Sequence, residues 1–354
     1  MKPIPPMTQD RLRELTDRFP SLRIAVIGDF FLDKYLDCDP RIAEKSVESG
    51  RTAHQVMRVR HSPGAAGTVV QNLAALDAGA LHAVGFTGDD GEACDLRKDL
   101  HALGCSTDLL LTAPDRMTMQ YLKPRNLTDA TLAGEHERYD TKNRTATPAE
   151  LEDRIIAAFD RALARADAVI VADQVEADDC GAVTARVRAA LSERARAHPG
   201  VVFFADSRTH IGRFRGLIIK PNQFEVAGVA QPLPGMEVDA DTLRAGLRRL
   251  RDEVGAPVIA TRGEKGAIVT DPEPTVVPGV RVDGPTDTTG AGDSMTAGCV
   301  LALAAGASLP EAALVGCLVA SITIQQLATT GTARRDELPD RLGLWLTQQQ
   351  EAQP

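Results

Sequence analysis

Short apolar runs alternate with amphipathic stretches along most of the chain. Residues 22–30 (LRIAVIGDF) are apolar up to a final Gly-Asp pair, which is typical of a buried parallel strand that opens into a loop. The next amphipathic stretch, 67–76, predicts a helix. Further strands are expected at 81–88, 167–173, 200–206, 216–222, 256–263 and 265–271, and further helices at 92–104, 148–165, 181–197 and 240–254. Because parallel strands need crossover connections, we predict an α/β fold whose mostly parallel sheet is covered on both faces.

One long polar stretch interrupts this alternation. Residues 33–62 separate the first strand from its helix, and a connection of that length indicates a small β lid inserted at the end of the strand. The stretches 116–125 and 135–140 have the pattern of strands that could pair with it. We therefore predict one domain over 1–354, with lid segments at about 33–62 and 115–140 and a polar tail at 346–354.

Composition narrows the class of partner. The formal net charge is −9, and the chain holds only one Trp, three Tyr and nine Phe, so the basic face and stacking rings of a nucleic-acid binder are not expected. The six cysteines form no CxxC pair, which argues against zinc and disulfides and favours a reducing, cytoplasmic setting. A small molecule is the expected partner.

No membrane segment is expected. Residues 1–19 have the pattern of a short amphipathic helix, not of a secretory signal. The apolar stretch 300–324 is interrupted by Gly306, Pro310 and Glu311, and each half is shorter than the roughly 20 residues that span a bilayer. Two buried helices are the preferred interpretation.

The stretch 287–298 (DTTGAGDSMTAG) carries the strongest chemical signal. Gly290, Ala291 and Gly292 can present backbone N–H groups at the start of a helix expected from about Ser294, a geometry that binds anions. Asp293 beside such amides makes sense as a base that takes a proton from a hydroxyl attacking a bound phosphoryl group. The structural alternative is that Asp293 only caps the helix and the glycines only turn the chain.

Three weaker stretches accompany it. Asn222 and Glu225 lie one helical turn apart, which suits Mg²⁺ held through water near phosphates, although a capping box explains the pair equally simply. Gly64 and Asn72 belong to a small-residue stretch before a helix, which suits a polyol or tight packing. Residues 28–33 place Asp29 and Asp33 at a strand end, where carboxylates can accept hydrogen bonds from sugar hydroxyls or lie solvated in a turn.

Together and in this order, these motifs resemble the PfkB family of ribokinase-like sugar kinases over about residues 22–338. Residues 287–298 are similar to its C-terminal signature, "PNQFE" to its Asn-x-x-Glu motif and 63–76 to its N-terminal glycine signature. Within the family, residues 28–47 and "TTGTARRDEL" resemble the kinase half of the heptose-phosphate enzymes of ADP-heptose synthesis.

The resemblance implies a ribokinase-like three-layer αβα fold, ATP as phosphate donor and Mg²⁺. It implies that Asp293 is the catalytic base, that residues 290–292 stabilise the transferring phosphoryl group, and that Asn222 and Glu225 position magnesium and its waters. The nucleotide would be bordered by Thr261, Gly263, Gly266 and the loop at 329–331 that contains Gly331. A homodimer formed through the lid is also implied.

Two departures from the family pattern concern the sugar. Thr68 stands where the N-terminal signature has an asparagine that contacts the sugar. Residues 174–179 (QVEADD) stand where heptose kinases have a stretch with Tyr, Lys and Gly, so negative charge replaces expected positive charge.

The leading substrate hypothesis is D-glycero-D-manno-heptose 7-phosphate, phosphorylated at the anomeric position. Its phosphate would need cations. The candidates, each of which could instead be a solvated surface residue, are Lys123, Arg125, Arg138, Arg208 and His210. The alternatives are another sugar, sugar phosphate or nucleoside, and a catalytically inactive sugar or nucleotide sensor. None of the seven histidines lies in a His-x-Gly-His motif, so no nucleotidyltransferase activity is expected from these residues.

Overall fold

The computed structural model describes residues 1–129, 134–327 and 329–352. Its central sheet is parallel throughout, as the alternating pattern predicts. The strands in spatial order are β14 (Ile218–Ile219), β13 (Val202–Ser207), β12 (Ala168–Asp173), β2 (Arg23–Gly28), β7 (Ala80–Thr87) and β8 (Cys105–Ser106), with β9 (Leu110–Thr112) also paired to β7.

A smaller sheet continues the central one. Its order is β1 (Lys2–Pro3), β17 (Thr275–Val277), β16 (Ala267–Val269) and β15 (Ile259–Thr261). The parallel bridges Ile219–Val258 and Asn222–Thr261 join it to β14. The carboxyl ends of β12, β13, β14 and β15 therefore lie along one edge, where ligands of such sheets bind.

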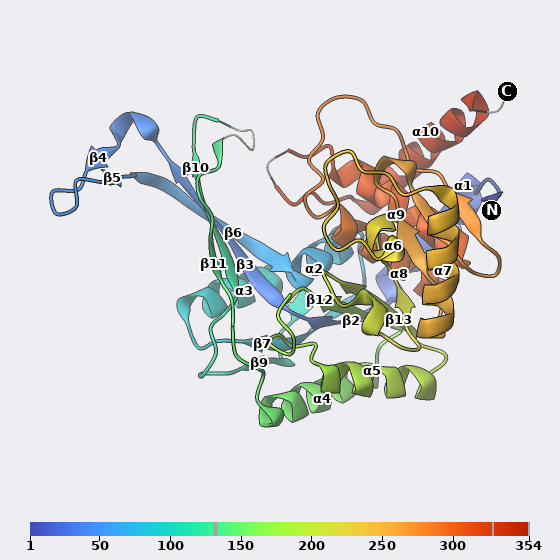
Figure 1. The fold of residues 1–354 in the computed structure, drawn as a ribbon, viewed down its shortest axis with the longest axis horizontal. Coiled ribbons are helices and arrows are strands. Elements are labelled where there is room, and N and C mark those ends of the chain that lie inside the picture. The colour runs from blue at the N-terminus through green and yellow to red at the C-terminus, as the bar shows by residue number, and fades with distance from the viewer. Residues whose placement is uncertain (130–133, 328, 353–354) are drawn as a thin grey trace.

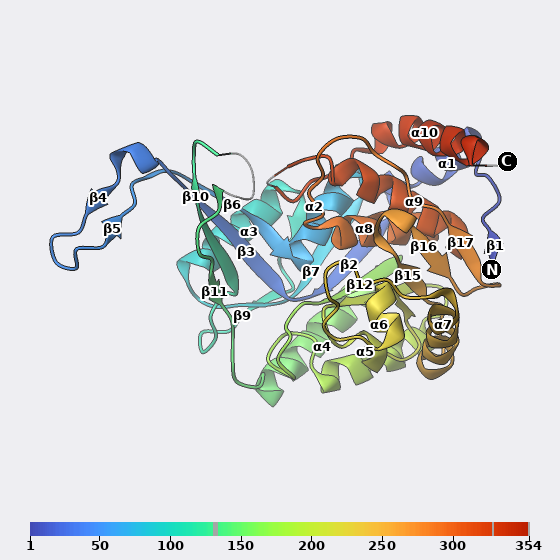
Figure 2. The same ribbon diagram turned by 45° about the horizontal axis from the view of Figure 1, so that its top comes forward.

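Helices cover both faces of the sheet (Figures 1 and 2). Alternate residues of β2 supply two apolar cores, with Ile24 and Val26 in one and Ala25 and Ile27 in the other. The first core is completed by α1 (Gln9–Thr16), α2 (Ala66–Ala75), α3 (Gly91–Ala102), α8 (Ala291–Ala304), α9 (Leu309–Thr323) and α10 (Leu338–Glu351). The second is completed by α4 (Ala149–Leu163), α5 (Ala185–Ala197), α6 (Gln223–Ala227) and α7 (Ala240–Val254). This is the predicted three-layer arrangement.

The apolar stretch near the C-terminus folds as two packed helices, as expected. Helices α8 and α9 are separated by Gly306 and approach closely because Gly316 has no side chain where Cys299 Sγ packs. Among the helices that the structure describes, none combines the length and apolarity needed to cross a membrane.

The predicted lid is a separate sheet that projects from the body (Figure 1). Its order is β11 (Tyr139–Thr141), β10 (Gln120–Asn126), β3 (Phe30–Cys38) and β6 (Val56–Ala65), and a short hairpin of β4 (Glu44–Lys45) and β5 (Thr52–Ala53) lies at its far end. We call the first four strands the lid sheet. Part of the predicted lid segment, 130–133, lies outside the described residues.

Several boundaries differ from the sequence expectation by a few residues, for example α5, expected at 181–197, and β10 and β11, expected at 116–125 and 135–140; three further differences affect the site or the predicted tail. Strand β3 starts at Phe30, directly after β2, so Asp33 lies within a strand instead of at the root of an irregular flap. Helix α8 starts at Ala291, not near Ser294, which places Asp293 in its first turn. Helix α10 continues to Glu351, because its apolar side packs on the first core, and so includes most of the predicted polar tail; residues 353–354 lie outside the described part.

Candidate active site

The start of α8 has the conformation that an anion site requires. Gly290 is the N-cap and has a φ of 76°, which a residue with a Cβ adopts only with strain. The N–H of Ala291 donates to Thr288 O at 3.1 Å. The free amides of the first turn are therefore those of Gly292 and Asp293, because they have no intrahelical acceptor. Thr330 would lie 3.5 Å from a Cβ at Gly290, so the 329–331 loop borders this turn.

The carboxylate of Asp293 lies at this turn without a hydrogen-bond partner among the described residues. Burial, followed by the negative charge of Asp206, raises its pKa to about 7, while Lys220 acts in the opposite direction. A carboxylate with a pKa near neutrality is suited to accept a proton from a hydroxyl at physiological pH.

Lys220 and Asp206 form a buried ion pair beside Asp293 that the sequence analysis did not assign to the site. Lys220 Nζ lies 2.9 Å from Asp206 Oδ2, and Thr296 Oγ1 donates to the same oxygen at 3.2 Å. Burial lowers the pKa of Lys220, but the charge and hydrogen bond of Asp206, together with the charge of Asp293, raise it above its ordinary value, so the ammonium stays charged. Lys220 Nζ would lie 3.5 Å from a Cβ at Gly292. A lysine ending the apolar run GLIIK, at the carboxyl edge of a parallel sheet, was the available signal.

Asp33 is an acidic residue of the lid sheet whose charge also raises the pKa of Asp293. Lys123 Nζ donates to its Oδ2 at 3.2 Å and to the Tyr35 hydroxyl at 3.4 Å. Its other oxygen, Oδ1, is buried without a hydrogen-bond partner among the described residues, and a Cβ at Gly64 would come within 2.8 Å of it. An unpaired buried carboxylate oxygen is costly, so this atom is a natural acceptor for a ligand hydroxyl. Gly64 leaves the room that such a contact needs.

Cationic side chains surround the ring of Tyr121, the register partner of Asp33 in the lid sheet. Arg138, Lys142 and Lys123 lie 4.4, 5.6 and 5.9 Å from its centroid. Arg138 is paired with both oxygens of Asp140, at 2.7 and 3.0 Å. Two of the predicted cations, Lys123 and Arg138, are therefore brought together with Asp33.

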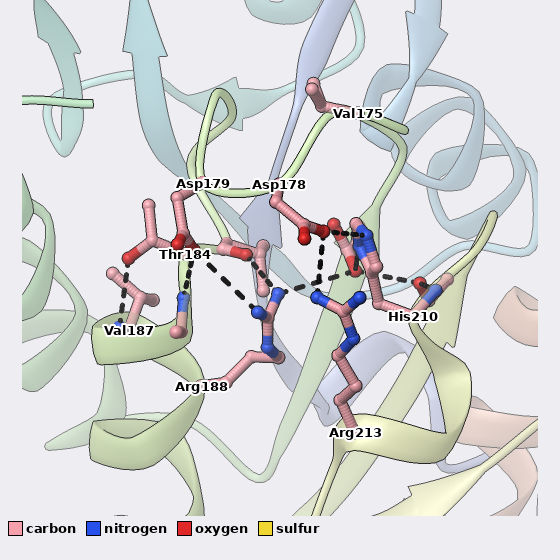
Figure 3. A network of polar contacts seen from close by, with 12 residues as sticks. Val175, Asp178, Asp179, Thr184, Val187, Arg188, His210 and Arg213 are labelled. Carbon is pink, nitrogen blue, oxygen red and sulfur yellow. Dashed lines mark hydrogen bonds and ion pairs between the residues drawn. The ribbon is translucent and has the colours of Figure 1, made fainter. Parts of the chain in front are cut away.

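The other predicted cations lie elsewhere or have protein partners. Arg125 is four residues beyond Tyr121 on β10, roughly 13 Å along the strand, and donates to Asp129 O. His210 lies between Asp173 and Asp178, at 3.2 and 2.9 Å. Figure 3 shows Asp178 directed toward both His210 and Arg213, next to the pair of Asp179 and Arg188. The acids of 174–179 thus have side-chain partners within this chain, and His210 is one of them.

Asp29, which was expected to contact the sugar, accepts its hydrogen bonds from backbone groups of this chain. Its carboxylate is buried and accepts backbone N–H groups from Gln174, Val175 and Ala182 at 2.8, 3.1 and 2.7 Å. Burial and then the charge of Asp173 raise its pKa to about 7. The geometry makes Asp29 the anchor of the loop that follows β12.

Thr68 and Asn72 are also buried. Asn72 Nδ2 donates to Thr68 O at 3.0 Å within α2, and its side chain is fully enclosed. Thr68 Cγ2 would lie 3.3 Å from a Cβ at Gly290. Thr68 thus packs against the start of α8, whereas Asn72 Oδ1 is buried without a hydrogen-bond partner among the described residues.

Asn222 and Glu225 form the capping box that was the structural alternative. Asn222 Oδ1 accepts from the N–H groups of Phe224 and Glu225, and Glu225 Oε2 accepts from Asn222 N at 2.6 Å. Burial raises the pKa of Glu225 to about 7. Its Oε1 is left for another partner, which fits magnesium held through water and phosphate oxygens, the usual mode for this ion. No set of three or more His, Cys, Asp or Glu in the described parts of the chain is arranged to hold a metal directly.

The residues predicted to border the nucleotide fall into two places. Thr261 pairs with Asn222 across a parallel bridge, and Gly263 (φ 58°) and Gly266 (φ 79°) follow it in the turn between β15 and β16. A Cβ at Gly266 would collide with Val277 O. Gly331 is buried against Thr323 O, and its loop lies at the start of α8. Strands β15 and β16, which the turn with Gly263 and Gly266 joins, lie on the side of α8 away from the lid sheet (Figure 2).

A protein-family model described as pfkB family carbohydrate kinase matches residues 23–335. The chain belongs to the pfkB family of carbohydrate kinases. The resemblance inferred from the motifs is therefore confirmed, and so is the expectation of an enzyme that acts as a sugar kinase.

Proteins named bifunctional protein HldE are among the relatives to which the chain is similar. The one from Gluconobacter oxydans is 28% identical over 335 residues, covering 93% of this chain and 66% of that protein. The one from Azotobacter vinelandii is 31% identical, covering 88% of this chain and 62% of that protein. The chain thus spans slightly less than two thirds of the length of these relatives.

Solved structures confirm the ribokinase-like fold. Arabidopsis thaliana ribokinase complexed with ribose and ATP has a TM-score of 0.64 at 17% identity, covering 91% of this chain and 98% of that one. Escherichia coli phosphofructokinase-2 in complex with substrates and products has a TM-score of 0.66 at 19% identity, covering 92% of this chain and all of that one (100%).

Proposed function

We propose that this carbohydrate kinase uses ATP to phosphorylate a sugar phosphate, with D-glycero-D-manno-heptose 7-phosphate at its anomeric hydroxyl as the leading substrate. The observation that carries the kinase chemistry is the unpartnered Asp293 carboxylate, with a pKa of about 7, in the first turn of α8. The leading substrate rests on the motif resemblance and on the cations gathered beside Asp33.

In the proposed reaction, the sugar lies between the lid sheet and α8. Asp33 Oδ1 accepts a hydrogen bond from one sugar hydroxyl, which fixes the ring. Asp293 takes the proton of the attacking hydroxyl, whose oxygen forms the new bond to the γ-phosphorus while the bond to the β,γ-bridging oxygen breaks and ADP leaves.

Charge on the transferring phosphoryl group would be stabilised by fixed donors. These are the amides of Gly292 and Asp293 and the ammonium of Lys220, which Asp206 holds in place. Glu225 and Asn222 would hold Mg²⁺ through water, and the ion would neutralise phosphate charge. Thr261, Gly263, Gly266 and Gly331 would border the nucleotide.

We further infer that two copies associate through the lid sheet. Its strands β6 and β11 are edges, and exposed apolar side chains lie on them, namely Val56, Met57, Val59 and Tyr139. An exposed strand edge with apolar side chains is stabilised when another copy covers it. The cytoplasmic setting predicted from the cysteines and the N-terminal pattern is part of the same proposal.

An ADP-release screen tests this function. Purified protein with ATP and Mg²⁺ is offered free and phosphorylated sugars, including both anomers of heptose 7-phosphate, and the phosphorylated product is identified by NMR. We expect the highest kcat/KM for a sugar phosphate. Equal activity on the unphosphorylated sugar would reject the phosphosugar assignment, and ATP binding without ADP release on any sugar would favour the sensor alternative.

A further inference from the structure

Glu176 lies in the loop after β12 and pairs with two cations. Its Oε1 accepts from Arg208 Nε at 2.9 Å, and its Oε2 lies 3.7 Å from Lys142 Nζ. Hydrogen bonds fix the loop backbone before Glu176, because the preceding residues Gln174 and Val175 donate their N–H groups to the buried Asp29 carboxylate. The backbone next to Glu176 is therefore fixed to the end of β2.

The two cations face the sugar side of the proposed active site. Lys142 Nζ lies 5.6 Å from the centroid of Tyr121, and Tyr121 is the register partner of Asp33. The positive charge of Arg208 acts to lower the pKa of both Tyr121 and Asp293, so its guanidinium faces the same region. A sugar that contacts Asp33 and Asp293 would therefore present its remaining end to Arg208 and Lys142.

The charges around Tyr121 differ in how firmly they are paired. Arg138 is held by two hydrogen bonds to Asp140, and Lys123 is buried against Asp33. Within the described parts of the chain, the ion pairs of Lys142 are long, at 3.7 Å to Asp140 and 3.7 Å to Glu176. Arg208 and Glu176 are each about half exposed, so their pair is weak and can exchange partners.

We propose that Glu176 determines specificity by competing with the phosphate group of a phosphorylated sugar for Arg208 and Lys142. The phosphate carries up to two negative charges and would have to displace the Glu176 carboxylate from both cations, whereas a neutral sugar would leave the pairs intact. Glu176 therefore raises KM for phosphorylated sugars selectively. This inference rests on the proposed function for its substrate class.

The test compares wild type, Glu176→Gln and the matched control Glu193→Gln. The control removes the same charge from an exposed glutamate on α5 that pairs with Arg194. KM and kcat are measured at low salt for D-glycero-D-manno-heptose 7-phosphate and for the same heptose without phosphate. We expect Glu176→Gln to lower KM for the phosphorylated sugar about tenfold, with kcat and the free-sugar KM unchanged. An equal change for both sugars, or none, would overturn the inference.

Inorganic phosphate gives a readout that does not depend on turnover. Calorimetric titration should show tighter phosphate binding to Glu176→Gln than to wild type, and the gain should vanish in the double variant Glu176→Gln/Arg208→Gln. Tighter binding without any sugar-kinase turnover would leave the inference standing and reject the proposed substrate. Unchanged phosphate binding would overturn the inference even if the enzyme phosphorylates heptose 7-phosphate.

Discussion

Lys220 Nζ and Asp206 Oδ2 are 2.9 Å apart at the carboxyl edge of the central sheet, next to Gly292 in the first turn of α8. The pair places a permanent positive charge where the proposed phosphoryl group would lie. It also keeps the negative charge of Asp206, which raises the pKa of Asp293, in a fixed position. The charges of Lys220, Asp206 and Asp293, at the ends of two strands and the start of one helix, thus act on one another.

Replacing Lys220 by Met should damage both stability and activity. The change leaves Asp206 buried with Thr296 as its remaining side-chain donor. We expect the free energy of unfolding to fall by about 3 kcal/mol, as for other broken buried pairs. Urea denaturation of Lys220→Met and of Lys220→Met/Asp206→Asn separates the effects: the double variant should regain most of the stability but no activity. Full activity in the double variant would exclude a role for Lys220 in phosphoryl transfer.

Asp293→Asn should lower kcat by at least about a hundredfold, because the base is lost while the fold is kept. In the wild type, kcat/KM should rise tenfold per pH unit below about pH 7 and level off above it, since the base acts deprotonated and its pKa is about 7. Glu225→Gln should keep this acidic limb, because Glu225, with the same pKa, is not the base. Initial rates from pH 5 to 9 check both. An unchanged kcat in Asp293→Asn would contradict the assignment.

Asp293 should also cost stability at high pH. Its folded pKa of about 7 exceeds the unfolded value of about 3.9, so the protonated form stabilises the fold below about pH 4 and this contribution is lost as the pH rises through 7. Asp293→Asn should therefore have a free energy of unfolding about 1–3 kcal/mol above that of wild type at pH 8, and so a higher Tm. The difference should vanish near pH 4. Scanning calorimetry at both pH values checks this. A destabilised variant at pH 8 would mean that the carboxylate makes favourable contacts.

Glu225→Gln separates the two roles of Glu225. An amide oxygen can still accept from Asn222 N, so the capping box and the stability should be preserved. The negative charge that would face the proposed magnesium and phosphate is lost, so we expect the Mg²⁺ concentration for half-maximal activity to rise about tenfold. A magnesium titration of the activity provides the measurement, with urea denaturation as the control. Reduced stability with normal magnesium dependence would leave only the capping role.

Met57→Lys on the exposed edge of the lid sheet should disrupt the proposed dimer. The side chain is 57% exposed, so the change is compatible with the folded monomer but places a charge in an apolar interface. Multi-angle light scattering should show a dimer for wild type and a monomer for the variant. A wild-type monomer at working concentration would remove the dimer proposal.

The sequence by itself determined the layered α/β fold and the core of the site. Alternation of apolar runs with amphipathic stretches is a local property, and so is the glycine at position 290, whose positive φ glycine adopts without strain. Asp293, Asn222 and Glu225 could be singled out for the same reason. Asn222 and Glu225 lie within three residues of the backbone N–H groups that they accept from, and Asp293 lies in the helix turn that holds the free amides.

Only the tertiary structure decided which charged side chains meet. Lys220 follows β14 and Asp206 belongs to β13, while Glu176, Lys142 and Arg208 come from three separate segments, so no spacing in the sequence reveals their pairing. Burial decided the surroundings of two further polar residues. The Asp29 carboxylate is enclosed and accepts hydrogen bonds from three backbone N–H groups, and the packing of α2 encloses Asn72. A charge's role depends on its distance to other charges and on its access to water, and both are set by packing between remote segments.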